Sequence, residues 1–326
     1  MTFEQITLKR VGIAGAAGYT GGELIRLLLN HPGVELCWLH SRSNAGKRLD
    51  EVHHDLLGET ELRFTEPDFQ QIDFLFLCLG HGESRKYLLE HQVPKHIRII
   101  DLSQDFRLDE NWVYGLPELN RTAIRSSGKN IANPGCFATT IQLALLPLAA
   151  RQLLNDDIHI SAITGSTGAG QSLSQSSHFS WRSNNVSNYK TLDHQHLAEI
   201  GRTLRNLQPE GLQEIRFIPY RGSFTRGIFA TVYIPTTLSI EDANTLFQQA
   251  YHEHPFVWLS HIPVDIKQVV NTNKCFLYLE KKDDMLVISS VTDNLLKGAS
   301  GQAVQNFNLL AGFAEDTGLR LKPSAF

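Results

Sequence analysis

The chain has 326 residues, of which 42% are hydrophobic and 20% charged, so it can bury a full core in one large domain or two ordinary ones. Its formal net charge of -4 gives no electrostatic case for a nucleic-acid or anionic-membrane partner, and no stretch approaches the roughly 20 apolar residues that cross a bilayer. Because no apolar signal core precedes the first expected strand, we expect a cytoplasmic protein with a small-molecule substrate.

The N-terminal pattern predicts a strand, a glycine turn, a helix and a second strand. An apolar run covers residues 9 to 15, an amphipathic pattern follows from Gly22 to Leu29, and a second apolar run covers Val34 to His40. Three more elements are expected: strands at Asp73–Leu79 and Ile97–Leu102, and a helix at Ser84–His91. This alternation predicts the α/β class, with a parallel sheet that binds a nucleotide.

After residue 136 the pattern changes. A helix is expected over Ala138–Leu154, followed by strands that are separated by long polar stretches. These strands are Ile158–Ile163, Ile215–Pro219, Phe229–Ile234 and Met285–Val291. Fewer helices between strands indicate an α+β domain, with an antiparallel or mixed sheet covered by helices on one face. We place the domain boundary near residue 140 and expect a last helix over Ala299–Phe313 that could return to the first domain.

A glycine-rich turn links the first strand to the first helix. Its glycines are spaced three residues apart in the segment Gly15-Ala16-Ala17-Gly18-Tyr19-Thr20-Gly21. Backbone N–H groups can approach a pyrophosphate there, and the helix N-terminus adds a favourable dipole. Although glycine spacing alone also fits a turn without ligand, its position at the first strand of an α/β chain favours a dinucleotide site.

The residues after the second strand indicate which dinucleotide binds. A site that prefers NAD would place Asp or Glu here to hydrogen-bond the ribose 2′-hydroxyl. This chain instead has Ser41, Arg42 and Ser43, and a guanidinium with two hydroxyls suits a 2′-phosphate. We therefore expect NADP(H), the alternative being that Arg42 is an ordinary solvated charge.

Cys136 is the candidate nucleophile. It follows a Pro-Gly turn in the segment Asn133-Pro134-Gly135-Cys136-Phe137 and begins the expected apolar helix, whose dipole favours a thiolate. The other cysteines are expected to be inert small hydrophobes beside strands: Cys37, Cys78 and Cys275. All four are expected as reduced thiols, since their spacing fits neither zinc-binding pairs nor a disulfide framework. A thiolate beside a nicotinamide indicates a thioester route.

Acid–base candidates lie in the segment from Asp193 to Ile200. It contains His194, His196 and Glu199, and the last two are spaced to share a helix face. Two alternatives remain: a solvated pair of surface histidines, and a zinc site built on His-x-His, which lacks further paired ligands. We expect no metal.

Polar residues at strand ends are candidates for anion recognition. Ser103 and Arg107 follow the strand over Ile97–Leu102, and Arg226 lies in a second polar turn. For either arginine, a surface salt bridge is the ordinary alternative. The expected substrate-binding residues are Ser103, Arg107, Asn133, Glu199 and Arg226.

Together, these motifs resemble N-acetyl-γ-glutamyl-phosphate reductase, of the semialdehyde dehydrogenase superfamily, over nearly the whole chain. The resemblance rests on five segments in order: GAAGYTGGEL, ANPGCFATT, GSTGAG at Gly165 to Gly170, HQHLAEI, and DNLLKGASGQAVQN from Asp293 to Asn306. It implies reduction of an N-acylated γ-glutamyl phosphate by NADPH to the semialdehyde and inorganic phosphate, in arginine biosynthesis. The family's nucleophile falls on Cys136.

The resemblance also implies a domain layout. A Rossmann NADP-binding domain, residues 1–140 and 300–326, would carry an inserted α+β catalytic and dimerisation domain, residues 141–299, in a homodimer or homotetramer. Further cofactor contacts implied by it are Leu79, Gly80, Gly165, Ser166 and Asn294. Gln195 and Ala198 replace the arginine and proline usual in relatives, which leaves open whether His194 or His196 is the acid–base group.

Three other functions fit the same motifs. The N-acyl group could be succinyl instead of acetyl, or the substrate could be the shorter one of aspartate-semialdehyde dehydrogenase, which uses the same thioester chemistry. The third is a catalytically silent NADP-binding regulator in which Cys136 is merely structural.

Overall fold

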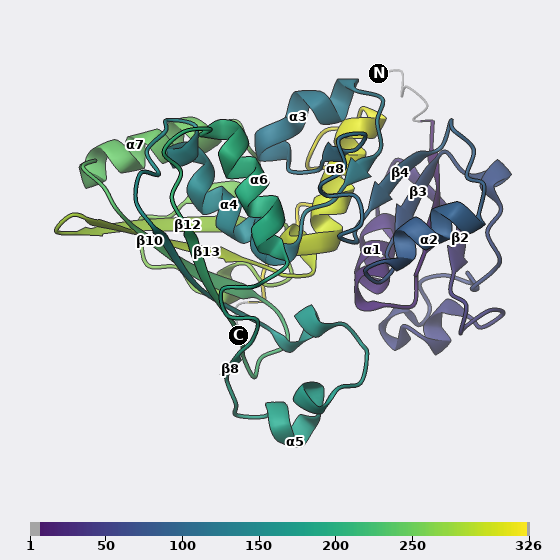
Figure 1. The fold of residues 1–326 in the computed structure, drawn as a ribbon. Helices are drawn as coiled ribbons and strands as arrows, with labels where there is room; N and C mark the ends of the chain where they lie inside the picture. Colours follow the sequence, from purple (N-terminus) through teal and green to yellow (C-terminus); the bar gives the residue numbers. More distant parts are fainter. Residues whose placement is uncertain (1–6, 325–326) are drawn as a thin grey trace. The chain divides into compact units, whose positions relative to one another are not determined.

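The computed structural model describes residues 7–324 and divides the chain into two compact units (Figure 1). The first unit runs to Asn133 and also takes Ala299–Arg320. The second consists of Pro134–Gly298 and the residues from Leu321 onward. No helix among the described residues is long and apolar enough to span a membrane.

The first unit contains a six-stranded sheet in the order β2-β1-β3-β4-β6-β5, in which every pair of neighbours is parallel. Its strands are β1 (Lys9–Ala14), β2 (Val34–His40), β3 (Phe74–Leu77), β4 (Arg98–Asp101), β5 (Val113–Tyr114) and β6 (Ile131–Ala132). Its helices are α1 (Tyr19–Leu29), α2 (Glu83–Glu90), α3 (Pro117–Ser126) and α8 (Gly301–Ala311). The predicted parallel, Rossmann-type sheet is confirmed.

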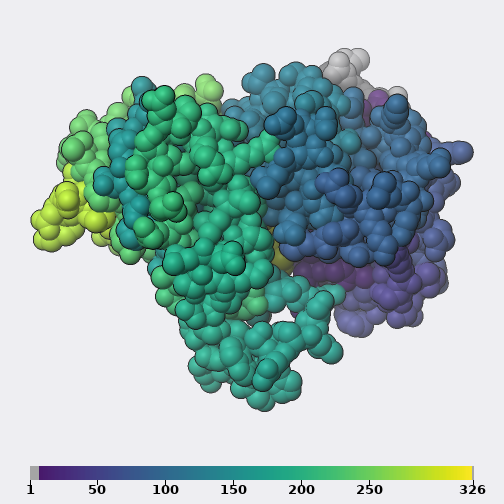
Figure 2. Space-filling model, in the orientation of Figure 1, coloured from purple at the N-terminus to yellow at the C-terminus, as the bar shows by residue number. Residues whose placement is uncertain are grey.

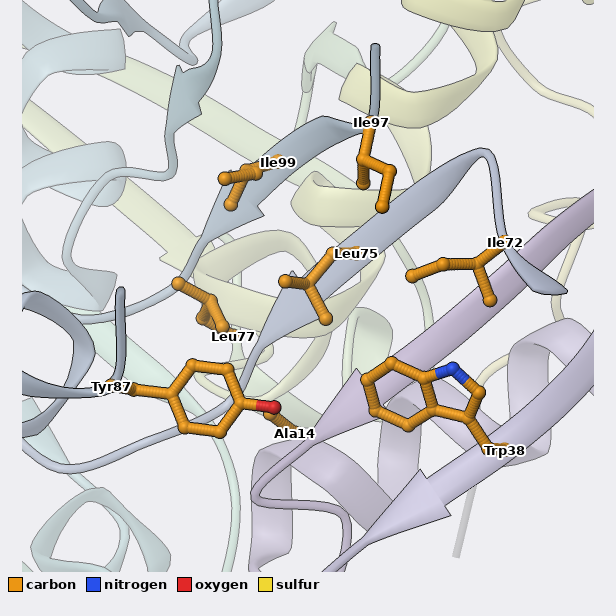
Figure 3. Packing of buried hydrophobic residues seen from close by; sticks show 8 residues of the cluster. All are labelled: Ala14, Trp38, Ile72, Leu75, Leu77, Tyr87, Ile97 and Ile99. Carbon is orange, nitrogen blue, oxygen red and sulfur yellow. The ribbon is translucent and has the colours of Figure 1, made fainter. Parts of the chain in front are cut away.

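Uninterrupted apolar runs produce the central strands of this sheet. All four residues of β3, Phe-Leu-Phe-Leu, are buried, as expected for a parallel strand covered on both faces. Figure 3 shows one part of the core, where the Trp38 indole and the Tyr87 ring lie beside aliphatic side chains of β3 and β4. The glycine turn begins directly after β1, which pairs with β3 in this sheet.

The second unit contains a seven-stranded mixed sheet in the order β11-β12-β13-β10-β7-β9-β8. Its strands are β7 (Ile158–Thr164), β8 (Ser187–Asn188), β9 (Ile215–Arg221), β10 (Ile228–Pro235), β11 (Val257–Leu259), β12 (Cys275–Lys282) and β13 (Met285–Thr292). Its helices are α4 (Cys136–Ala149), α5 (Phe179–Arg182), α6 (His196–Leu207) and α7 (Ile240–Tyr251). Helices α4, α6 and α7 cover one face of the sheet, which confirms the predicted α+β class (Figure 1).

Short turns of 3-10 helix complete the described chain at Leu49–Glu51, His54–Leu56, Phe69–Gln71, Ser166–Ala169, Gln175–Ser177 and Ile266–Gln268. The segment that carries α5 projects from the sheet of the second unit, and Figure 2 shows it as a separate teal lobe. Its exposed apolar side chains include Leu173 and Phe179.

Helix α4 differs from its prediction at the C-terminal end. Pro147 has no N–H, so the carbonyl of Leu143 loses its helical partner, and the hydroxyl of Tyr251 donates a hydrogen bond to it at 2.6 Å. The predicted extension to Leu154 was wrong, because the helix ends at Ala149 and Gln152 then takes a left-handed φ of 56°.

Other elements were not predicted or differ from their predictions. No helix was predicted at α3, α5 or α7, and no strand at β5, β6, β8 or β11. Strand β12 was missed, because its second half, Glu-Lys-Lys, lacks an apolar pattern. The last predicted helix is preceded by a π-helical turn at Leu296–Ser300, and α8 ends at Ala311, before Gly312 with a φ of 82°.

Candidate active site

The glycine turn of the first unit is closely packed against the sheet. The N–H groups of Gly15 and Ala16 both donate to the carbonyl of His40, at 3.0 Å each. Gly15 has a φ of +78°, and a Cβ there would lie 2.4 Å from the carbonyl oxygen of Cys78. No side chain among the described residues caps α1 at Gly18, so the first N–H groups of α1 are suited to an anion such as a pyrophosphate.

The residues after β2 lie at the same edge of the sheet and are already hydrogen-bonded. The amide nitrogen of Asn44 donates to the hydroxyls of Ser41 and Ser43, at 3.2 and 3.1 Å. The guanidinium of Arg42 donates to Glu90 on α2 at 2.7 Å and lies 3.9 Å from a carboxylate oxygen of Glu83. A 2′-phosphate at Arg42 would therefore have to compete with these carboxylates.

The predicted anion-binding residues of the first unit form a buried network at the carboxyl ends of β4 and β6. The guanidinium of Arg107 donates to the carbonyls of Asn133 and Leu102 at 2.9 and 3.0 Å, and it is almost completely buried. The hydroxyl of Ser103 donates to Asp101 at 2.7 Å, and burial raises the pKa of Asp101. Arg107, Ser103 and Asn133 are therefore brought together as expected of neighbouring strand ends. Leu79 and Gly80 follow β3 at this edge.

Cys136 is the first residue of α4, as predicted. Gly135 precedes it in an extended conformation as the N-cap, and Cys136 itself is partly exposed. A Cβ at Gly298 would lie 2.9 Å from the Cβ of Cys136, so glycine leaves room beside the thiol. None of the four cysteines forms a disulfide, and burial raises the pKa of Cys78 to about 12, which keeps it a thiol. Burial also raises the pKa of Cys37.

The acid–base candidates lie at the start of α6, in the same unit as Cys136. Glu199 is buried, its Oε2 atom accepts the backbone N–H of Gly135 at 3.1 Å, and its Oε1 atom lies 3.9 Å from Nε2 of His196. His194 precedes the helix, and its ring lies 4.6 Å from that of His196. The second unit therefore brings Cys136, both histidines and Glu199 together, which disfavours a solvated surface pair.

Two residues beside His194 had no signal in the sequence. The ring of Tyr189 lies edge-on to His194 at 5.6 Å, and the guanidinium of Arg221 lies 4.6 Å from the Tyr189 ring centroid. Burial raises the pKa of Tyr189 to about 12, and the charge of Cys136 acts in the same direction. Tyr189 follows the two-residue strand β8, and no spacing rule connects it to the histidines.

The remaining predicted residues of the second unit have structural partners. Arg226 donates to the buried Asp293 from two nitrogens, at 3.0 and 3.1 Å, so this ion pair is not the surface salt bridge given as the alternative. Asn294 accepts the N–H of Gly227 at 2.7 Å and donates to Thr167 at 2.9 Å. Asn294 thereby holds the turn that begins at Gly165 and Ser166. Among residues 7–324 no group of three or more His, Cys, Asp or Glu side chains could hold a metal ion.

A Rossmann-type sheet and a helix-start cysteine beside histidines and a glutamate define a class of dehydrogenase. Family models match two regions: the semialdehyde dehydrogenase NAD binding domain at residues 10–127, and the semialdehyde dehydrogenase dimerisation domain at residues 136–294. The chain therefore belongs to the semialdehyde dehydrogenase family. It is an oxidoreductase with a nicotinamide cofactor.

Within this family, highly similar curated relatives are named N-acetyl-gamma-glutamyl-phosphate reductase. Those from Parabacteroides distasonis and Bacteroides thetaiotaomicron are each 54% identical, over 97% of this chain and 99% of their own length. One from Flavobacterium johnsoniae is 53% identical with the same coverage. The resemblance expected from the motifs is confirmed.

Solved structures share the fold at low identity. Aspartate semialdehyde dehydrogenase II complexed with ASA, from Vibrio cholerae, superposes with a TM-score of 0.76 at 18% identity, covering 94% of this chain and 99% of that one. Aspartate semialdehyde dehydrogenase from Francisella tularensis gives a TM-score of 0.70 at 17% identity. The agreement extends over both units and supports the fold alone.

Proposed function

We propose that the chain reduces N-acyl-γ-glutamyl phosphate with NADPH, giving N-acyl-glutamate 5-semialdehyde and inorganic phosphate, as a step of arginine biosynthesis. The observation that carries the proposal is the hydrogen bond that joins Glu199 to Gly135, since it connects the histidine-bearing helix to the start of the cysteine-bearing one. The named activity of relatives that are 54% identical supports the substrate class.

The first unit fits a dinucleotide. At Gly15 and Gly21 a Cβ would lie within 3 Å of backbone atoms, so the turn is built for close backbone approach. Ala17, Gly18, Tyr19 and Thr20 would contribute the helix N-terminus, and Ser41, Arg42 and Ser43 would hold a 2′-phosphate. When bound, NADPH supplies hydride to the acyl carbon.

The covalent steps depend on Cys136. Its thiolate attacks the acyl carbon, an S–C bond forms, and the C–O bond to phosphate breaks, so that inorganic phosphate leaves with the electron pair. The resulting thioester becomes a thiohemiacetal when it accepts hydride. Collapse of the thiohemiacetal breaks the S–C bond, which releases the aldehyde and restores the thiolate.

Proton transfer is assigned to the histidine that faces Glu199. His196 would give a proton to the developing alkoxide and remove it during collapse, with the Glu199 carboxylate 3.9 Å away to stabilise the imidazolium. Backbone N–H groups at the start of α4 would stabilise the oxyanion.

Recognition of the substrate anion is assigned to the first unit. Arg226 already faces the Asp293 carboxylate at 3.0 Å, so a substrate anion there would compete with it. The guanidinium of Arg107 donates to the carbonyls of Asn133 and Leu102, and we propose that Arg107, with Ser103 and Asn133, orients the phosphate or α-carboxylate.

The match to a dimerisation domain indicates that the protein assembles, and we propose a homodimer or homotetramer. We further propose a cytoplasmic enzyme without a nucleic-acid or membrane partner. Its partners would be the small substrate and phosphate.

The proposed reaction is tested in reverse, as phosphate-dependent reduction of NADP. N-acetylglutamate, N-succinylglutamate and aspartate semialdehydes are compared in parallel assays. Activity with a glutamyl substrate supports the proposal and identifies the acyl group. Activity only with aspartate semialdehyde moves the protein to aspartate-semialdehyde dehydrogenase, and no activity with any of the three favours a silent NADP-binding protein.

A further inference from the structure

His194 is a buried polar side chain that packs against the start of α4, where the candidate nucleophile lies. His194 is only 5% exposed. Its ring packs against aromatic rings from other elements of the second unit. The centroid distances are 5.6 Å to Phe137, 5.6 Å to Tyr189, 4.6 Å to His196 and 5.5 Å to Phe217. All four contacts are edge-on or nearly so, and together they hold the ring in one orientation.

The His194 ring accepts a hydrogen bond at the N-terminus of α6. Nδ1 of His194 accepts the backbone N–H of His196 at 3.2 Å, and the carbonyl of His194 accepts the N–H of Leu197 at 2.9 Å. The first N–H groups of a helix have no partner within the helix, and a preceding side chain usually satisfies them. His194 therefore acts as a cap for the helix that carries His196 and Glu199.

Capping through Nδ1 requires a neutral ring with its proton on Nε2, because a protonated ring has two donors and no acceptor. The charged groups that face the ring favour this state. Two cations act on the His194 ring: Lys190 in the preceding loop and Arg221 on β9. The other titratable groups that face the ring are Tyr189 and His196, which contact it edge-on. Burial first, and then these two cations, lower the pKa of His194 to about 4.

The capped turn leads directly to the nucleophile. Glu199 lies in the first turn of α6, and it binds the backbone N–H of Gly135, the residue before Cys136. We propose that His194 is a positioning residue, a fixed neutral imidazole that orders the first turn of α6 so that His196 and Glu199 meet the start of α4, and that it transfers no proton itself. The turnover test of this proposal rests on the proposed function, because it measures the proposed reaction.

Three variants separate positioning from chemistry. His194→Asn keeps a side-chain oxygen that can accept the N–H two residues later but cannot transfer protons. His194→Leu keeps bulk and removes the acceptor, and the matched control His196→Asn removes the other imidazole. We expect His194→Asn to keep kcat within about threefold of the wild type with an unchanged pH profile. We expect a loss of about tenfold or more for His194→Leu and of about 10² to 10⁴-fold for His196→Asn.

A second measurement needs no substrate. The rate at which iodoacetamide alkylates Cys136, followed by mass spectrometry of the peptide that contains it, should fall in His194→Leu and stay near the wild-type rate in His194→Asn. If wild type turns over none of the semialdehydes, the proposed function fails, and these alkylation rates still decide the role of His194.

Several outcomes would overturn the assignment. One is a folded His194→Asn variant as inactive as His196→Asn, and another is a His194→Leu variant with wild-type turnover and alkylation. His194→Ser, a second capping variant, guards against a folding defect peculiar to asparagine. Failure of both capping variants to fold would also contradict the proposal, because it requires that an acceptor at this position suffices.

Discussion

The backbone N–H of Gly135 donates a hydrogen bond of 3.1 Å to Glu199, a buried carboxylate on another helix. Because the same carboxylate lies 3.9 Å from Nε2 of His196, Glu199 connects the start of the cysteine helix to the imidazole. A buried carboxylate is costly unless it is paired and hydrogen-bonded, and both partners belong to the candidate site.

Glu199→Gln tests this connection. Gln keeps an oxygen for the N–H of Gly135 and loses the charge that faces His196, so we expect kcat to fall about tenfold or more with little change in the KM for NADPH. Glu199→Ala should also lower stability by about 1–3 kcal/mol, because it leaves a buried N–H unsatisfied. Steady-state kinetics and thermal unfolding measure the two effects. The control is Glu241→Gln, on the exposed face of α7, and wild-type kcat in Glu199→Gln would contradict the prediction.

Replacing Cys136 by Ala should abolish turnover while leaving NADPH binding intact. The proposed thioester cannot form without the thiol, whereas the predicted cofactor residues of the glycine turn belong to the other unit. Turnover and NADPH fluorescence titration give the two readouts. Cys37→Ala, a change of a half-buried cysteine in β2, should keep its activity. Residual turnover in Cys136→Ala would exclude the thioester route, and simultaneous loss of NADPH binding would indicate misfolding.

Sequence patterns were sufficient to predict those elements whose structure depends only on nearby residues. The four buried residues of β3, the amphipathic pattern of α1 and the position of Cys136 after a Pro-Gly turn all depend on local periodicity and turn chemistry. The end of α4 could not be read this way. Its Pro147 is compatible with the helix because Tyr251, more than a hundred residues later, satisfies the carbonyl of Leu143.

The electrostatics of the candidate site also depend on contacts that no local pattern contains. Arg226 faces Asp293 and Arg42 faces Glu90, and no motif around either arginine predicts these carboxylate partners. The enclosure of His194 depends on Phe217, which comes from β9. These three contacts join residues that are far apart in the sequence. They depend on the order of the strands and the placement of the helices, which no local sequence pattern shows.

The pairing of Arg42 with Glu90 predicts an effect on cofactor binding. Glu90→Gln should lower the Kd for NADPH by about two- to fivefold, because an exposed ion pair contributes about 0.2–1 kcal/mol that a 2′-phosphate no longer has to replace. Binding of NADH should not change, since it lacks that phosphate. Fluorescence titration measures both values. Arg42→Ala is the opposite control and should weaken NADPH binding alone; equal effects on NADPH and NADH would refute a role at the 2′-phosphate.

The low pKa of His194 makes the stability of the second unit depend on pH. Above pH 6.5 the ring is neutral in both the folded and the unfolded chain, so the free energy of unfolding carries no penalty from it. Between pH 6.5 and about 4 the unfolded chain binds a proton that the folded chain does not, so stability falls as the pH falls. The full shift corresponds to about 3 kcal/mol, and below pH 4 both states are protonated.

His194→Asn should remove this contribution. We expect its urea midpoint to fall less than that of the wild type between pH 7 and pH 4.5, followed by circular dichroism at several pH values. His31 and His40, whose pKa values burial also lowers, add the same slope to both proteins and cancel in the comparison. The matched control is His261→Asn at an exposed position, which should leave the wild-type slope unchanged. Parallel curves for His194→Asn and the wild type would mean that His194 takes up its proton over the same pH range in the folded and unfolded chains, which would contradict a lowered pKa in the folded chain.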